Sequence, residues 1–218
     1  MTASKDISNT IGVYGTMQER FWAGEFGDDY IIRNDSKKLI AANTVLFSKV
    51  LRYTHNVKSV LELGANIGLN LVAIHSLLPL AKISGVEINT KASEILTKLD
   101  YIETINTSLL DLSLDKKYDF VFTKGVLIHQ NPEMLQRVYD LIYECSNRYI
   151  FIFEYYNPVP MEVKYRGFDS VLFKRDFAGE LMDKYSDLKL IDYGFVYHRD
   201  NNFPGDDFNW FLMQKQQV

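Results

Sequence analysis

The residues whose types and spacing most clearly indicate a chemical role lie in two short stretches, 59–70 and 84–89. The first, SVLELGANIGLN, has the pattern of a buried strand that runs into a glycine-containing loop and then a helix. The second, SGVEIN, is a short apolar run that ends on the carboxylate of Glu87. An acidic residue about 20 positions after a strand, glycine loop and helix binds ribose in doubly wound sheets. The two stretches therefore predict a ribose-containing ligand, with Glu87 accepting hydrogen bonds from both ribose hydroxyls.

The spacing of the glycines indicates which ribose-containing ligand is bound. A dinucleotide loop, G-x-G-x-x-G, would need glycine where this chain has Asn66 and Leu69. The loop of S-adenosylmethionine enzymes, acid-x-G-x-G-x-G, is matched by Glu62, Gly64 and Gly68. Asn66 is its one departure, and asparagine tolerates left-handed backbone. The carboxylate at the strand end would repel a pyrophosphate and attract the ammonium of a methionine group. The loop favours S-adenosylmethionine, with S-adenosylhomocysteine as its product; the alternative is an ordinary strand–helix turn with two glycines.

Composition narrows the class of protein. The 218 residues suit one domain, predicted over 1–218, and the formal net charge of -4 gives no support for a nucleic-acid partner. The one cysteine, Cys145, excludes a disulfide or a cysteine-type metal site within one chain, and we predict no metal. No apolar run approaches the length of a membrane span, and the polar start MTASKDISNT does not resemble a signal peptide. We therefore expect a cytoplasmic protein, with its oligomeric state left open.

Alternating apolar runs and helical patterns must position these residues. The expected strands are 58–63, 83–87, 102–106, 119–125 and 148–154, and the expected helices include 67–78, 90–99 and one opening near Pro132. Such alternation predicts an α/β fold with a mostly parallel sheet. At the end of the chain, 189–200 and 208–215 flank the turn NNFPGDD and predict an antiparallel hairpin. Residues 17–54 are expected to form an N-terminal lid and helix, and 58–218 the core.

This layout resembles the Rossmann-like sheet of class I S-adenosylmethionine-dependent methyltransferases. More narrowly, the chain is similar to the family of pseudaminic acid biosynthesis-associated methylases. The blocks that carry the narrower resemblance are FWAGEFGDDYIIRN (21–34), LELGANIGLN (61–70), GVEIN (85–89), TKGVLIHQNP (123–132), EYYNP (154–158), YRG (165–167), LFKRDFAGELMD (172–183) and DYGFVYHRD (192–200). The resemblance implies a methyltransferase and points to a surface-sugar precursor as its substrate.

The remaining cofactor contacts are expected beyond the carboxyl ends of the strands, where ligands of open α/β sheets bind. Ile88 follows the ribose carboxylate and can pack on the adenine. The class places Ser108 and Leu109 at the adenine edge, although a plain turn is the alternative. Lys124 ends the fourth strand near the expected sulfonium; because two cations repel, we expect its backbone to contribute and its side chain to turn away.

The aromatic segment 21–34 is expected to act as the lid. Its aromatic residues would close over the cofactor, and Arg33 would reach the cofactor's carboxylate; the alternative is an ordinary packed helix. These aromatic residues are Phe21, Trp22, Phe26 and Tyr30. Excluding water and fixing in-line geometry matter most for methyl transfer, because the sulfonium is already a good leaving group.

His129 is the expected catalytic base, because a neutral imidazole just past strand four can take a proton from a hydroxyl or amine. A structural histidine is the alternative. Glu154 and Tyr155 end strand five beside the same cleft and are the other catalytic candidates.

A local excess of basic residues on this acidic chain predicts an anionic substrate, with a solvated surface as the alternative. The substrate-binding candidates are Tyr156, Arg166, Lys174, Arg175, His198 and Arg199. The predicted function is transfer of a methyl group from S-adenosylmethionine to an oxygen or nitrogen of a small anionic metabolite, such as a pseudaminic acid type or nucleotide-sugar precursor. The alternative is a non-catalytic S-adenosylmethionine-binding subunit that supports a partner enzyme.

Overall fold

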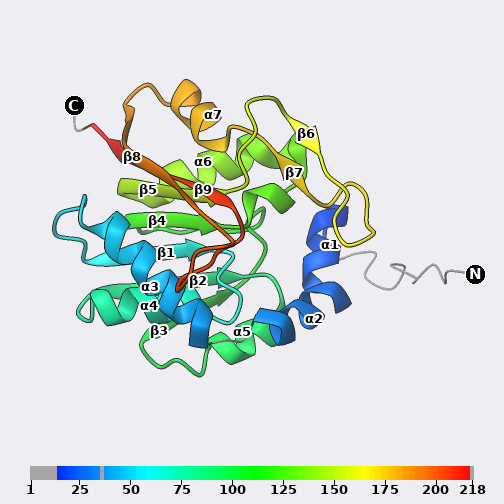
Figure 1. Cartoon of the computed structure of the whole chain (residues 1–218), viewed down its shortest axis with the longest axis horizontal. Coiled ribbons are helices and arrows are strands. Elements are labelled where there is room, and N and C mark those ends of the chain that lie inside the picture. The colour runs from blue at the N-terminus through cyan, green and yellow to red at the C-terminus, as the bar shows by residue number, and fades with distance from the viewer. Residues whose placement is uncertain (1–13, 35–36, 217–218) are drawn as a thin grey trace, which may run out of the picture.

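A seven-stranded sheet runs through the centre of the molecule in the order β3-β2-β1-β4-β5-β9-β8 (Figure 1). The computed structural model describes residues 14–34 and 37–216, so the rest of the predicted domain lies outside the described residues. The strands are β1 (Ser59–Leu63), β2 (Lys82–Glu87), β3 (Ile102–Asn106), β4 (Tyr118–Lys124), β5 (Ser146–Glu154), β8 (Leu188–Val196) and β9 (Phe208–Lys215). The first five pair in parallel, and β9 joins β5 and β8 antiparallel. The predicted mostly parallel sheet with a closing antiparallel hairpin is confirmed.

Helices cover both faces of this sheet. They are α1 (Met17–Ala23), α2 (Glu25–Asn34), α3 (Lys37–Leu51), α4 (Leu69–Leu77), α5 (Thr90–Leu96), α6 (Leu135–Cys145) and α7 (Phe177–Lys184), with short 3₁₀ turns η2 (Leu127–His129) and η3 (Pro132–Met134). The α3 and α4 helices pack together, α6 packs on β4 and β5, and α7 packs on β5 and β8. Within the described part of the chain, no helix is long and apolar enough to cross a membrane.

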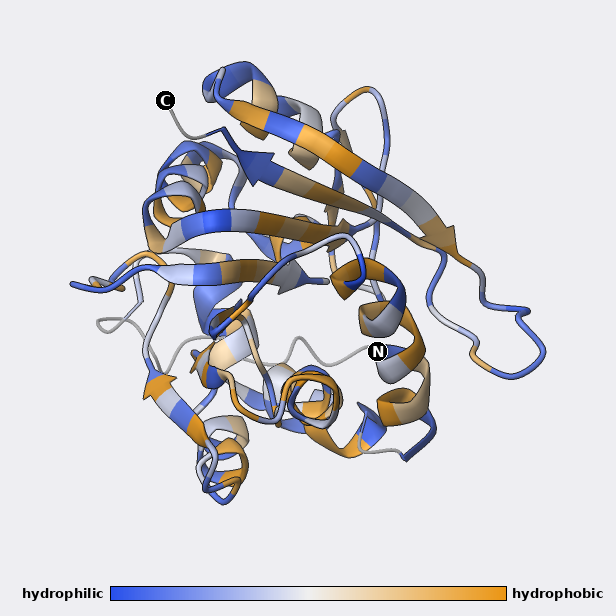
Figure 2. Cartoon of the chain, turned by 90° about the vertical axis from the view of Figure 1, so that its left-hand side faces the viewer, coloured by the Kyte–Doolittle hydropathy of each residue, from blue (hydrophilic) through white to orange (hydrophobic). Residues whose placement is uncertain are grey.

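The core explains why the central strands read as continuous apolar runs. Parallel strands are covered on both faces, so neither face needs polar residues. In β4, Phe120, Val121 and Phe122 are all fully buried although they point to alternate faces. Figure 2 shows the same concentration of hydrophobic residues in the inner strands, while β8, at the edge of the sheet, mixes both kinds.

A small ribbon of β6 (Met161–Glu162) and β7 (Phe173–Lys174) was not predicted. Two-residue strands are too short to show an alternating pattern, so the sequence offers no periodicity for them. The segment between them lies beside α1, where the Gln18 side chain donates a hydrogen bond to the carbonyl of Ser170 at 2.8 Å (Figure 1). This contact joins the N-terminal helices to a segment 152 residues later.

Candidate active site

The loop after β1 has left-handed backbone at three alternate positions. The φ angles are 84° at Gly64, 47° at Asn66 and 84° at Gly68. A Cβ at Gly64 would lie 2.4 Å from a methyl carbon of Val126, and one at Gly68 would lie 2.5 Å from Leu96 Cδ1. The glycines are therefore required by both backbone and packing. Asn66 adopts the conformation that glycine has in the methyltransferase pattern, so this departure leaves the loop shape intact.

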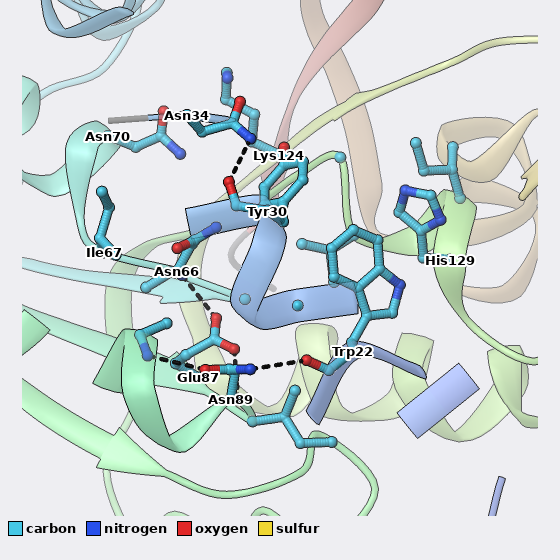
Figure 3. Close-up of a pocket in the computed structure, with 18 of the residues that line it drawn as sticks. Trp22, Tyr30, Asn34, Asn66, Ile67, Asn70, Glu87, Asn89, Lys124 and His129 are labelled. Carbon is cyan, nitrogen blue, oxygen red and sulfur yellow. Dashed lines mark hydrogen bonds between the residues drawn. The ribbon is translucent and has the colours of Figure 1, made fainter. Parts of the chain in front are cut away.

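Glu87 ends β2 and ties two loops together through its carboxylate (Figure 3). Its Oε2 accepts a hydrogen bond from the Asn66 N–H at 2.7 Å, and its Oε1 accepts one from the Asn89 N–H at 2.7 Å. Burial raises the pKa of Glu87, and these backbone hydrogen bonds act against that rise. Each carboxylate oxygen has a second lone pair, which remains available to a ligand hydroxyl.

A cavity of about 380 Å³ lies above this carboxylate, within the usual size of small-molecule sites. Of the predicted residues it is lined by Trp22, Tyr30, Arg33, Gly64, Asn66, Glu87, Ile88, Ser108, Leu109, Lys124, His129, Tyr155 and Arg166. The others, Glu62, Gly68, Glu154, Tyr156, Lys174, Arg175, His198 and Arg199, lie outside its lining. The structure therefore brings most predicted cofactor residues together with two of the three catalytic candidates.

The N-terminal helices close one side of this cavity. Trp22 and Tyr30 line it, whereas Phe21 stacks on Phe26 with ring centroids 4.1 Å apart and Phe168 packs on both. The predicted lid aromatics thus divide into two that face the ligand space and two that anchor the helices. The anchoring pair is placed as in an ordinary packed helix, and the cavity-facing pair is placed as expected for a lid.

Asn89 holds the same helices to the Glu87 loop. Its buried side chain donates to the carbonyl of Trp22 at 3.2 Å and to the carboxylate of Asp28 at 2.9 Å (Figure 3). Lys91 pairs with the other oxygen of Asp28 at 2.6 Å. Sequence reasoning missed Asn89, although an asparagine directly before a helix is a common N-cap, and here its side chain does accept from the Ala92 N–H.

Glu19 also lines the cavity and was missed. Its carboxylate accepts a hydrogen bond from the Ser108 hydroxyl and closes a capping box with Thr16 at the start of α1. The Leu110 N–H donates to the same Ser108 hydroxyl at 3.0 Å. The T-x-x-E pattern at 16–19 was a readable sign of this helix start.

His129 is held in one tautomer on η2. Its Nδ1 lies 2.6 Å from the carbonyl oxygen of Val171. Because a carbonyl only accepts hydrogen bonds, Nδ1 carries the proton and Nε2 keeps a lone pair. Burial lowers the pKa of His129 to about 4, so the ring is neutral at pH 7. Trp22 and Tyr165 pack beside it, with ring centroids 4.6 and 5.3 Å away.

Glu154 supports the turn that carries His129 and does not face the cavity. Its fully buried carboxylate accepts hydrogen bonds from the N–H groups of Val126 and Leu127 at 3.0 Å each and of Ile128 at 3.4 Å. Burial raises the pKa of Glu154 to about 7. The structure therefore corrects the catalytic expectation for Glu154, because its oxygens are engaged by three backbone donors.

Glu62 lies beneath the glycine loop, away from the cavity lining. Its Oε1 accepts a hydrogen bond from the Asn70 side chain at 2.6 Å, while Oε2 has no partner among the described residues. Burial raises the pKa of Glu62 to about 8. Direct contact with a ligand ammonium, expected from the sequence, is not what this position offers, because the side chain is fully buried.

The predicted basic cluster is largely neutralised by its own neighbours. Arg175 pairs with Glu180 at 2.8 Å, and His198 Nδ1 lies 2.8 Å from Asp207. The Lys174 ammonium lies over the ring of Tyr155, 4.6 Å from its centroid. Tyr156 and Arg199 are exposed. Of this group, the structure places Arg166 alone at the cavity.

The far wall comes from the hairpin, where sequence reasoning selected His198 and Arg199 and missed the two residues that line the cavity. Asp206 and Phe208 line the cavity, and Phe208 packs edge-on against Tyr155 with centroids 4.3 Å apart. Because β9 runs antiparallel to β5, its first residues lie at the carboxyl end of β5. The predicted hairpin already implied this placement.

No family model matches the sequence, and no curated protein matches it. Solved structures do match the fold. The plantazolicin methyltransferase BpumL, with an analogue and S-adenosylhomocysteine bound, is 17% identical over 88% of this chain and 90% of its own, with a TM-score of 0.61. The 1,6-didemethyltoxoflavin-N1-methyltransferase of Burkholderia thailandensis is 13% identical over 88% and 84%, with a TM-score of 0.64. Magnesium protoporphyrin IX methyltransferase from Synechocystis PCC 6803 is 13% identical over 91% and 98%, with a TM-score of 0.66. The chain therefore has the fold of class I S-adenosylmethionine-dependent methyltransferases.

Proposed function

We propose that this protein transfers a methyl group from S-adenosylmethionine to an oxygen or nitrogen of a small molecule. One observation carries the proposal: a single cavity is lined by the Glu87 carboxylate, the left-handed loop at Gly64 and Asn66, and the neutral imidazole of His129. The structures of similar fold that hold S-adenosylhomocysteine act, by their names, on small molecules, which supports the same cofactor here.

The cofactor would lie across the strand ends from β2 to β4. Glu87 would accept the ribose hydroxyls, Ile88 would pack on the adenine, and Ser108 with Leu109 would border the adenine edge. Tyr30 and Trp22 would cover the cofactor from the lid. The strand order β3-β2-β1-β4 supports this placement, because ligands of open α/β sheets bind beyond the carboxyl ends of the strands.

The chemical step would need little from the protein beyond geometry and one proton acceptor. The acceptor oxygen or nitrogen forms a bond to the methyl carbon while the carbon–sulfur bond breaks, leaving the neutral thioether. The proton of the methyl acceptor passes to Nε2 of His129, whose ring is held by the Val171 carbonyl and is neutral at pH 7. The lid helices exclude water from this transfer.

The acceptor is proposed to be a small anionic metabolite. Three cationic residues, Lys124, Arg33 and Arg166, line the cavity against Asp206, Glu19 and Glu87, and Glu19 and Glu87 are engaged by hydrogen bonds within the protein. Together with the resemblance of several sequence blocks to pseudaminic acid-associated methylases, this favours a sugar acid or nucleotide sugar.

A non-catalytic cofactor-binding subunit was suggested by Asn66 alone. Because Asn66 adopts the backbone conformation expected of glycine, it gives no reason for lost catalysis. We therefore propose the enzyme.

Thermal unfolding with added ligands tests the cofactor. A ligand at about 100-fold excess over its Kd stabilises the native state by about 2.7 kcal/mol. We expect a clear rise in Tm with S-adenosylmethionine and S-adenosylhomocysteine, and none with NAD. A rise with NAD and none with the sulfur ligands would refute the proposal. Incubation with methyl-labelled cofactor and a metabolite extract would then identify the acceptor by its label.

A further inference from the structure

Lys124 places a positive charge in the cavity without a protein anion beside it. It is the last residue of β4, is half-buried, and lines the cavity (Figure 3). Its ammonium lies 5.2 Å from the ring centroid of Phe153, its cross-strand neighbour on β5. The sequence predicts that this side chain turns away from the cavity. The Phe153 ring that its ammonium faces is outside the cavity lining, whereas Asp206, the carboxylate that attracts it most, is part of that lining.

Within residues 14–34 and 37–216, no carboxylate oxygen lies within 4.0 Å of this ammonium, and none of the hydrogen bonds engages it. Glu62 and Glu154 attract it from farther away. Glu154 accepts hydrogen bonds from backbone N–H groups, and one of the two oxygens of Glu62 accepts from Asn70. Asp206, in the hairpin loop, attracts it more strongly than either. Burial lowers the pKa of Lys124, as expected for an ammonium that has lost water without gaining a partner.

Two other partly buried cations of the protein, Lys215 and Arg175, have oxygen partners. The Lys215 ammonium donates to the carbonyl of Ser146 at 2.7 Å, and Arg175 pairs with Glu180 at 2.8 Å. Removing a charge from water is costly unless another group replaces the water. At Lys124 no oxygen of the described residues takes the place of that water.

We propose that the Lys124 ammonium is the anion-binding group of the cavity and pairs with a carboxylate or other oxyanion of a bound ligand. The inference rests on the proposed function, because it assumes that the cavity holds the cofactor and an acceptor. Two sources offer this chemistry: the carboxylate of the cofactor's methionine part, and an acidic group of the acceptor. In both cases the charge pair forms at the end of β4, beside the reacting centre.

Calorimetry on a Lys124→Met variant tests the first source. The ligands are S-adenosylhomocysteine and its decarboxylated analogue, S-adenosyl-3-thiopropylamine. If Lys124 binds the cofactor carboxylate, the variant loses about 10- to 100-fold in affinity for the first ligand and little for the second. Lys124→Arg, which keeps the charge, should restore most of the loss.

The second source is tested on protein saturated with S-adenosylhomocysteine. The probes are N-acetylneuraminate and its methyl ester, which differ in the carboxylate charge. If Lys124 binds the acceptor anion, wild type prefers the free acid, the variant loses that preference, and cofactor affinity is unchanged.

Lys49→Met is the matched control for both arms. The Lys49 ammonium also lies over an aromatic ring, 5.3 Å from the centroid of Trp210, but outside the cavity lining. Its loss should change neither affinity. Thermal unfolding of each variant checks that it is folded.

Two results separate failure of the inference from failure of the proposed function. If wild type binds S-adenosylhomocysteine and Lys124→Met matches it with every probe, Lys124 is not the anion site and the inference is refuted. If wild type does not bind S-adenosylhomocysteine at all, the proposed function is refuted, and the inference, which depends on it, is refuted as well.

Discussion

The carboxylate of Glu87 accepts hydrogen bonds from two loops and borders the cavity. A substitution that keeps the side-chain shape tests the contribution of its charge to ligand binding. Glu87→Gln keeps the shape but removes the charge. Because a hydrogen bond to a charged group contributes about 1.5–3 kcal/mol, affinity for S-adenosylhomocysteine should fall at least about 10-fold by calorimetry.

Glu103→Gln provides the control for this change. Glu103 lies on the neighbouring strand β3, bonds Ser84 at 2.7 Å and pairs with Lys116, outside the cavity lining. Equal affinities in wild type and Glu87→Gln would place the ribose elsewhere.

His129 should remain neutral over the whole physiological range. Burial lowers its pKa to about 4, below the usual value near 6.5, so the charged form appears only as pH falls toward 4. Imidazole ¹⁵N spectra should show one neutral tautomer, protonated at Nδ1, from pH 5.5 to 8. The His129→Gln spectrum assigns the signal, and His75, stacked on Tyr101 away from the cavity, is the internal comparison. Titration of the assigned signal near pH 6.5 would contradict the buried, neutral base.

The sequence predicts the place of a single residue at the cavity when that place depends only on where a strand ends. Glu87 and His129 follow parallel strands, so their place at one edge of the sheet could be read from the pattern. Glu154 also ends a strand, but its role depends on three N–H groups of the turn at 126–128, which no pattern reveals. Arg175 looked available for a substrate because its pairing with Glu180 is a property of the folded structure.

At the scale of elements, the turn into α4 depends on glycine for two reasons that can be separated. Gly68→Ala meets both a left-handed backbone and a clash with Leu96. Gly167→Ala meets the backbone strain alone, because nothing lies within 4 Å of its Cβ position. Urea unfolding should show a loss of about 1–2 kcal/mol for Gly167→Ala, from strain. Gly68→Ala should lose about 1–3 kcal/mol more, from overpacking. If both variants lost the same free energy of unfolding, the packing between α4 and α5 would accommodate the added Cβ without loss of stability.

Elements with long patterns were predictable, and those that depend on tertiary contact were not. The strands 59–63 and 118–124 contain the apolar runs Val60-Leu61 and Phe120-Val121-Phe122, so their existence followed from the sequence. The β6–β7 ribbon has two residues on each side. The division of the lid into anchoring and cavity-facing aromatics depends on Phe168, which is distant in sequence. Whether the whole chain forms one domain stays a prediction.

For the molecule as a whole, buried carboxylates set how stability varies with pH. Glu62 has its pKa raised to about 8 in the folded state, so the folded state holds a proton that the unfolded state releases above its own, ordinary pKa. Its contribution is complete below about pH 4.5 and is lost as pH rises through 8. His129 acts in the opposite direction, between about pH 4 and 6.5, because its folded-state pKa is lowered.

Glu62→Gln isolates the first effect, since glutamine stays neutral. Between pH 5.5 and 7.5, the free energy of unfolding of wild type should fall relative to this variant by up to about 1.4 kcal/mol per pH unit, measured by urea unfolding. Glu103→Gln should show no such trend, because pairing with Lys116 lowers the pKa of Glu103 and leaves it ionised in both states. Parallel curves for wild type and Glu62→Gln would mean that Glu62 is ionised in the fold.

The insertion of β9 between β5 and β8 has a consequence for how the protein is made. Chains emerge from the ribosome N-terminus first, and β1 to β5 with the loops between them carry Glu87, Gly64 and His129 of the cavity lining. The opposite wall needs Asp206 and Phe208, which come after β8. Until β9 has emerged, β8 has no neighbour through which to join the sheet and β5 presents an open edge. If the proposed function holds, a nascent chain carries its ribose-binding carboxylate before it can enclose a ligand. During that interval the exposed edge of β5 is where a chaperone or a neighbouring chain would bind.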